Sequence, residues 1–209
     1  MRYAWPALMQ SLVASHPEVE PLLTDRPQRA KLLDAMVRAV AEKGYEAATV
    51  ADAVRLARVS RGTFYECFAS KEACLAAAYE AGTEVLETRV AQATRGAEDW
   101  IAELRLGIRA YLDTLDGEPA FARVYLLEWP AVGGARDAAM WRFARRYGKS
   151  FARSGGPVPP PEALYVLAAG VHALACARVR ESRKTIDLED VLVACAVRLA
   201  GGKEQQAWT

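Results

Sequence analysis

The sequence is poor in the residue types that build metal and redox sites. Its 209 residues include only two histidines and four cysteines, and no two cysteines form a CxxC pair. His16 and His172 lie far apart in the chain, so no zinc-binding pattern is present and we expect no bound metal. Cysteines without such spacing are typical of reduced thiols in a cytoplasmic protein.

Long hydrophobic runs are also missing. No uninterrupted apolar stretch reaches the roughly 18 residues of a membrane span, so we expect no membrane partner. Residues 1–24 are a poor secretory signal, because Pro6 and Gln10 interrupt their apolar residues. We interpret them as an N-terminal extension of open function and expect a cytoplasmic protein.

A strong charge of either sign is absent. The chain has 27 basic and 26 acidic side chains, a net charge of +1, which argues against a histone-like, polycationic DNA-binding protein. Residues 25–72 have nine basic and seven acidic side chains, an excess of two. Sequence-specific DNA binding stays compatible with this, because the local distribution of charge matters more than the total. Because the sequence shows no nucleophile–base pair or phosphate-binding loop, we expect neither enzyme activity nor a cofactor.

Helical periodicity fills most of the chain, and no alternating strand pattern accompanies it. One apolar stripe with spacings of three and four comprises Leu32, Leu33, Met36, Val37 and Val40. Gly44 is the expected end of that helix. Two final helices are expected at about 161–181 and 187–200, after the proline-rich loop GGPVPPP at 155–161. The sequence therefore predicts an all-α fold.

Residues 49–72 contain the most informative pattern. Thr49 and Ser60 are expected to cap two short helices separated by a turn at 57–59, and Ser70 is expected to cap a third helix. The second helix has an apolar inner face, formed by Phe64 and Phe68. Its outer face is small or polar and comprises Arg61, Gly62, Thr63 and Glu66, with Tyr65 at the flank. A helix-turn-helix needs such a second helix to enter the major groove of DNA.

This segment resembles the TetR (tetracycline-repressor-like) family of bacterial transcriptional regulators. The resemblance rests on EKGYEAATV (42–50), RVSRGTFYECF (58–68) and SKEA (70–73), and it extends from about Arg26 to Leu75. It implies a three-helix DNA-binding head at 25–75 and a larger helical body for ligand binding and dimerisation at 76–209.

The resemblance also implies which residues contact DNA. They are Thr49, Ser60, Arg61, Gly62, Thr63, Tyr65 and Lys71. Arg61 is the candidate for reading guanine through O6 and N7, while most of the others are expected to contact phosphates. Where the family often has glycine this chain has Arg58, so either Arg58 is left-handed or the turn differs. Cys67 stands where the family often has histidine, which removes one expected phosphate contact.

For the body, the resemblance implies a homodimer in which the last two helices pair with their copies. The same apolar stripes could instead close the core of a single protomer. Some of the aromatic residues are expected to line a cavity for an effector. The expected ligand contacts are Arg109, Tyr125, Glu128, Trp129, Trp141 and His172, although His172 also fits a purely structural role.

The leading hypothesis is a ligand-responsive transcriptional repressor. It would bind a palindromic double-stranded DNA operator and leave it when a small apolar or aromatic effector binds. Two alternatives stay open, namely an enzyme that uses the aromatic cavity and a helical protein-interaction module that has lost specific DNA binding.

Overall fold

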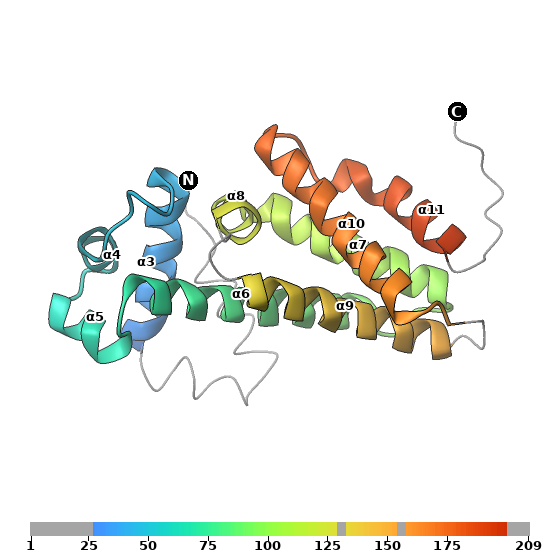
Figure 1. Ribbon diagram of the computed structural model, residues 1–209, viewed down its shortest axis with the longest axis horizontal. Helices are drawn as coiled ribbons and strands as arrows, with labels where there is room; N and C mark the ends of the chain where they lie inside the picture. Colours follow the sequence, from blue (N-terminus) through green and yellow to red (C-terminus); the bar gives the residue numbers. More distant parts are fainter. Residues whose placement is uncertain (1–26, 129–132, 154–157, 200–209) are drawn as a thin grey trace. The chain divides into compact units, whose positions relative to one another are not determined.

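The computed structural model describes residues 27–128, 133–153 and 158–199, and all regular structure within them is helical (Figure 1). The all-α prediction is therefore confirmed for this part of the chain. The expected extension at 1–24 and Trp129 lie outside the described residues. The chain divides into two compact units. Unit 1 comprises the described residues of 1–88 and 117–131, and unit 2 comprises those of 89–116 and 132–209.

Unit 1 begins with three helices, α3 (Pro27–Lys43), α4 (Val50–Ala57) and α5 (Arg61–Cys67), which pack together (Figure 1). It continues with α6 (Lys71–Ala93) as far as Thr88, α8 (Pro119–Arg123) and the π-helical turn η1 (Val124–Glu128). The apolar stripe expected on the first helix is buried against its neighbours. Both α8 and η1 pack on α3, so unit 1 is built around that helix.

Local signals set the helix boundaries of unit 1, as the sequence predicts. Helix α3 ends at Lys43, and Gly44 follows with φ at +79°, a conformation that glycine adopts without steric penalty. Thr49 caps α4 in a complete capping box with Asp52. Ser60 caps α5, and the Ser70 hydroxyl accepts a hydrogen bond from the amide of Ala73 in the first turn of α6.

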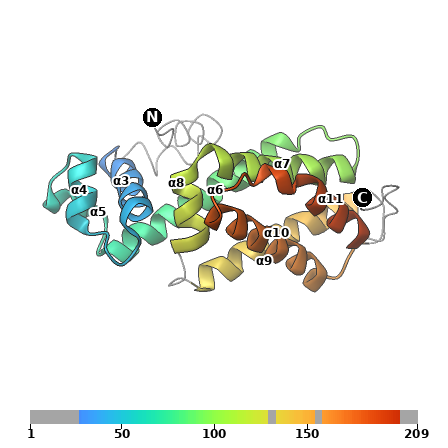
Figure 2. The same cartoon turned by 90° about the horizontal axis from the view of Figure 1, so that it is seen from above.

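Unit 2 contains α7 (Trp100–Gly117) up to Asp116, α9 (Gly133–Arg153), α10 (Pro161–Arg180), the 3₁₀ turn η3 (Ile186–Leu188) and α11 (Glu189–Leu199). Helix α10 packs on α9 and on α11 (Figure 2). The apolar contact between α9 and α10 includes Met140, Phe143 and Ala168.

Buried polar contacts hold the segment before α11 in place. The Asp116 carboxylate accepts hydrogen bonds from the Thr185 and Ile186 amides at 2.9 and 3.2 Å. The buried Glu189 carboxylate forms ion pairs with Arg105 at 3.3 Å and Arg109 at 2.8 Å. Because a buried carboxylate needs a partner, these contacts fix where α11 begins.

Helix α10 is long and apolar enough to cross a membrane by length and composition alone. One such helix is weak evidence, since a core helix of a soluble protein passes the same test. Its residues Leu164, Leu167 and Val171 are buried in unit 2, which accounts for much of its apolar character.

The limits of unit 1 differ from those of the predicted head. Unit 1 includes the first part of α6 beyond Leu75, and also α8 and η1, which the sequence places in the body. The functional division at residue 75 therefore stays a prediction.

Candidate nucleic-acid interface and internal cavity

Helix α5 is anchored to unit 1 by its inner face. Phe64 is fully buried and Phe68 nearly so, with their ring centroids 5.8 Å apart. Helix α4 contributes the fully buried Ala53, and the Arg29 guanidinium of α3 lies 4.4 Å from the centre of the Phe68 ring. The two phenylalanines therefore fix which side of α5 faces inward, as the sequence predicts.

The opposite side of α5 is open to solvent. Arg61, Gly62 and Glu66 are exposed, and 49% of Tyr65 is accessible. The Arg61 Nη2 donates a hydrogen bond to the Tyr65 hydroxyl at 3.4 Å, and its guanidinium lies 5.7 Å from the centre of that ring. Arg61 and Tyr65, one helical turn apart, thus form one polar edge of this face.

The first turn of α5 is fixed by Ser60. Its Oγ accepts a hydrogen bond from the Thr63 amide at 2.9 Å, and it lies 2.9 Å from the Thr63 hydroxyl. This cap satisfies a backbone amide that the helix leaves unpaired. Both hydroxyls remain at the exposed start of the helix, where the predicted phosphate contacts require them.

The turn between α4 and α5 contains a strained residue. Arg58 has φ 55° and ψ 47°, the left-handed conformation. Its amide donates to the carbonyls of Arg55 and Val54, and the Val59 amide also donates to Val54 O, at 3.1 Å. Of the two possibilities that the sequence left open, the left-handed arginine is the one found.

We expect Arg58→Gly to raise the free energy of unfolding of unit 1 by up to about 1 kcal/mol. The left-handed conformation costs a non-glycine residue about 1–2 kcal/mol, and the greater freedom of glycine in the unfolded chain offsets part of that gain. Urea unfolding followed by circular dichroism measures the change. Arg58→Ala, which keeps the strain and removes the charged side chain, should change stability little. A destabilised Arg58→Gly protein would contradict this account.

Thr49 takes part in a polar cluster at the start of α4. Its Oγ1 accepts from the Asp52 amide at 3.2 Å and donates to Asp52 Oδ2 at 2.7 Å. Hydrogen bonds from the Lys43 ammonium and the Thr49 hydroxyl hold the pKa of Asp52 well below its usual range. Asp52 is therefore an anion at neutral pH, and its carboxylate holds Thr49 in place by accepting hydrogen bonds from the Thr49 hydroxyl and amide.

Lys71 lies at the start of α6, where the sequence predicts a phosphate contact. Its Nζ donates to the carbonyls of Tyr45 at 2.9 Å and Ala48 at 3.2 Å, and it lies 4.1 Å from the centre of the Tyr45 ring. An ammonium group has three donors, and these carbonyls take two of them. Sequence reasoning missed this structural role, because it depends on a contact between residues 26 positions apart.

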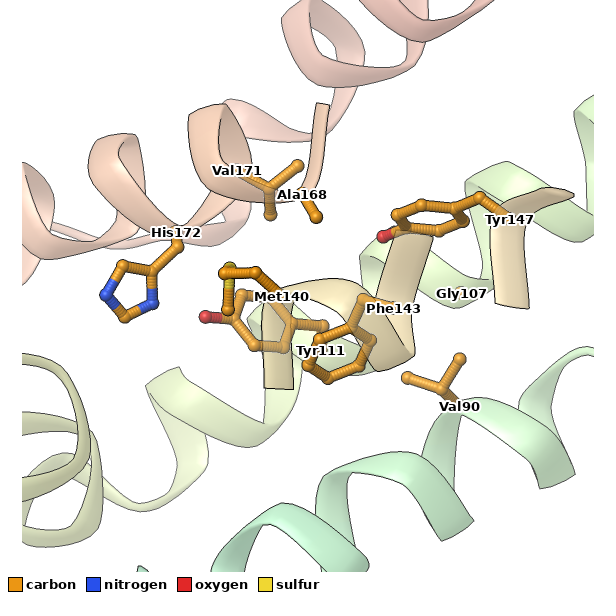
Figure 3. Close-up of a pocket in the computed structure, with 9 residues that line it drawn as sticks. All are labelled: Val90, Gly107, Tyr111, Met140, Phe143, Tyr147, Ala168, Val171 and His172. Atoms are coloured by element: carbon orange, nitrogen blue, oxygen red, sulfur yellow. The ribbon is translucent and has the colours of Figure 1, made fainter. Parts of the chain in front are cut away.

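Unit 2, which includes the end of α6 from Arg89, has a small, partly open cavity between that end, α7, α9 and α10, drawn in Figure 3. Its volume is about 20 Å³, room for roughly one water molecule. Its lining residues, none of which is Asp, Glu, Lys or Arg, are Val90, Gly107, Tyr111, Met140, Phe143, Tyr147, Ala168, Val171 and His172. Burial raises the pKa of Tyr147 to about 12, so its hydroxyl is neutral at physiological pH.

Of the six predicted ligand contacts, the structure places His172 on this cavity. Tyr125 lines a smaller cavity in unit 1, of about 10 Å³, and stacks on Tyr79 at 4.7 Å between ring centres. Trp141 packs on Tyr165, and Arg109 pairs with Glu189 as described above. Glu128 accepts a hydrogen bond from the Tyr45 amide. Tyr125 and Glu128 belong to unit 1 and the other three to unit 2, and the roles of all five as ligand contacts stay predictions.

Sequence reasoning did not select the other side chains of the cavity. Met140, Phe143 and Tyr147 are spaced by three and four along α9, which is the pattern of any apolar helix face. Only the way α9 meets α7 and α10 leaves a space beside them, and this packing is not visible in the spacing of one helix.

Comparison with known proteins gives one match to a family profile and several matches to solved structures. Residues 32–78 match the profile of the bacterial regulatory proteins of the tetR family. A search of curated proteins finds no match. The matched segment spans the whole helix-turn-helix region described above.

Solved structures share the fold over most of the chain. The fatty acid degradation regulator FadR from Bacillus halodurans has a TM-score of 0.72 and 18% identity, over 83% of this chain and 98% of that one. FadR from Bacillus subtilis, solved with stearoyl-CoA, has a TM-score of 0.71 and 19% identity, over 83% of this chain and 98% of that one. SCO4454, a TetR-family regulator from Streptomyces coelicolor, has a TM-score of 0.67 and 18% identity, over 93% of this chain and 94% of that one. Residues 32–78, which contain the exposed α5, therefore match the bacterial regulatory proteins of the tetR family, and the chain shares the fold of these solved structures.

Proposed function

We propose that the protein is a transcriptional repressor that binds a palindromic operator as a homodimer and is released by a small apolar effector. The observation that carries this proposal is the division of α5 into a buried aromatic face and an exposed polar face. A helix held in this way can enter a major groove without unpacking. The role is one of binding, so we expect no catalytic turnover and a cytoplasmic location.

Within the proposed interface the residues divide by role. Arg61 is the base-reading residue, because its guanidinium fork fits guanine O6 and N7. Ser60, Thr63, Tyr65 and Thr49 position the head on phosphates, and Gly62 permits close approach of the backbone. Lys71 would add the third donor of its ammonium group to a phosphate near the start of α6.

The exposed apolar face of α10 and α11 supports the proposed dimer. Val166, Leu174 and Leu199 are 61%, 43% and 40% accessible, and the small residues Gly170 and Ala173 lie beside them on α10. Exposed apolar side chains that gather on one face are typical of a protein interface. In a two-fold dimer the same face of both protomers forms the interface, so each of these side chains would be buried in both copies.

We expect Leu174→Glu to convert a dimer into monomers, because two buried carboxylates would face a shared apolar surface without partners. Light scattering after gel filtration distinguishes the 22.8 kDa protomer from twice that mass. Leu106→Glu is the matched control, since Leu106 is 37% accessible on α7 and lies outside the proposed interface. A monomeric wild-type protein, or a Leu174→Glu protein that stays dimeric, would rule out this interface.

The cavity of unit 2 supports the proposed response to an effector. Its lining is apolar and aromatic, with two tyrosine hydroxyls and one imidazole that can orient a ligand. Because it holds roughly one water as it stands, any larger ligand must displace side chains such as the flexible Met140. Such a ligand binds an expanded state of unit 2, and DNA binding shifts if that state fits the operator less well. The stearoyl-CoA complex of a protein with this fold makes long-chain acyl groups the first class to test.

The experiment that tests this function is a fluorescence anisotropy titration with duplexes that the wild-type protein retains from a random DNA library. We expect specific binding that weakens steeply with salt, because phosphate contacts release counterions. Stearoyl-CoA should then lower the affinity, whereas coenzyme A without the acyl chain should not. Retention of no duplex, or binding that ignores salt, would favour a helical protein-interaction module instead.

A further inference from the structure

The loop between α3 and α4, residues 44–48, is held by three side chains from distant parts of unit 1. The Tyr45 amide donates to Glu128 Oε2 at 3.0 Å. Lys71 Nζ donates to the carbonyls of Tyr45 and Ala48, and the Tyr45 hydroxyl donates to Glu72 Oε1 at 2.9 Å. Two of the three holding groups come from the start of α6 and one comes from the end of η1.

Glu128 is itself fixed by its surroundings. It is the last residue of the π-helical turn, in which Val124, Tyr125 and Leu126 are buried. Its second carboxylate oxygen lies 3.5 Å from Arg123 Nη2. Turns of this kind are rare in proteins and occur frequently at functional sites. The buried turn therefore sets where the carboxylate meets the loop.

The held loop leads directly into the DNA-binding elements. Thr49, the cap of α4, follows Ala48, and α4 leads through the Arg58 turn into α5. A shift of the loop would thus move the cap of α4 and, through α4 and the Arg58 turn, the start of α5. The hydrogen bond from Tyr45 to Glu128 joins this path to a segment 83 residues further along the chain.

We propose that Glu128 is a positioning residue for DNA binding, which fixes loop 44–48 through the Tyr45 amide, and that displacement of η1 lowers DNA affinity through this one contact. The inference rests on the proposed DNA-binding function. It assigns to Glu128 a role in the head, where the sequence suggested a ligand contact. An acceptor oxygen at this position is the chemical requirement, and the negative charge is secondary.

The test uses the full-length protein and the duplex retained by the wild type. Glu128→Ala removes the acceptor and should weaken binding about tenfold or more, the effect of leaving the part-buried Tyr45 amide without a hydrogen-bond partner. Glu128→Gln keeps an acceptor oxygen and should remain within about threefold of the wild type, a change smaller than that of one ordinary hydrogen bond. One control should bind like the wild type: Glu80→Ala, which removes an exposed carboxylate of α6.

Hydrogen exchange of a peptide covering residues 44–49 reads the contact directly. Exchange should accelerate in Glu128→Ala and stay slow in Glu128→Gln, while peptides from α10 remain unchanged in both. If Glu128→Ala does not fold, Glu128→Asp replaces it, since the shorter side chain keeps the charge but retracts the acceptor.

Three results would overturn the inference. The first is binding of the duplex by Glu128→Ala as tight as that of the wild type, and the second is unchanged exchange of its loop. The third is an equal loss of affinity in Glu128→Gln and Glu128→Ala, which would show that the acceptor oxygen is not what matters. Failure of the wild type to retain any duplex overturns the proposed function itself, and this inference with it. The two failures are distinguishable because the wild-type titration is read first.

Discussion

Replacing Phe64 with alanine is expected to lower the free energy of unfolding of unit 1 by about 3–5 kcal/mol and to abolish DNA binding. Truncation of a fully buried aromatic ring loses its transfer free energy and leaves a cavity. Phe64 is fully buried and packs edge-on to Tyr65 and against Phe68. Because domains typically unfold at a cost of only 5–15 kcal/mol, the head should populate states in which α5 is detached.

The measurement compares Phe64→Ala with Phe151→Ala, a matched truncation of a buried ring in unit 2. Hydrogen exchange should accelerate in α3–α5 for the first variant and in α9 and α10 for the second. DNA binding should disappear only in the first at temperatures where unit 2 stays folded. Equal DNA binding by wild type and Phe64→Ala would show that α5 does not depend on this anchor.

The short helices α4 and α5 and the end of α3 could be predicted from the sequence because their signals are local. Thr49 and Ser60 cap helices through contacts three residues away, and the four-residue spacing of Phe64 and Phe68 defines a face. Gly44 marks the end of α3 through its own backbone conformation. Such signals need no knowledge of how distant segments pack.

The cavity and the contacts of loop 44–48 could not be predicted, because both depend on distant residues. Glu128 meets Tyr45 across 83 positions, and no spacing rule connects them. The contact of Arg109 with a buried carboxylate 80 positions away could not be predicted for the same reason. For Arg58, the sequence narrowed the turn to two possibilities, and the φ angle decided between them.

Arg61→Ala is expected to weaken binding to the preferred operator by about 1–3 kcal/mol, or roughly 5- to 150-fold, and to relax the choice of base at one position in each half-site. The physical reason is the loss of two parallel hydrogen bonds to one guanine. In the free protein Arg61 is exposed and contacts the Tyr65 hydroxyl at 3.4 Å. That contact is long and accessible to water, so the guanidinium can leave it for a base at small cost.

Substitution series separate base reading from phosphate binding at this position. Binding of all single-base variants of the duplex should show that Arg61→Ala loses discrimination at one base pair, whereas a phosphate contact would weaken every duplex equally and lower the salt slope by about one. Arg61→Lys should retain the salt dependence and lose most of the discrimination, because an ammonium group lacks the planar fork. Tyr65→Phe, which removes only the hydroxyl, should leave the base preference unchanged. If Arg61→Ala keeps the full preference for the original base pair, another residue of α5 reads it, and the exposed Arg61 contributes only charge.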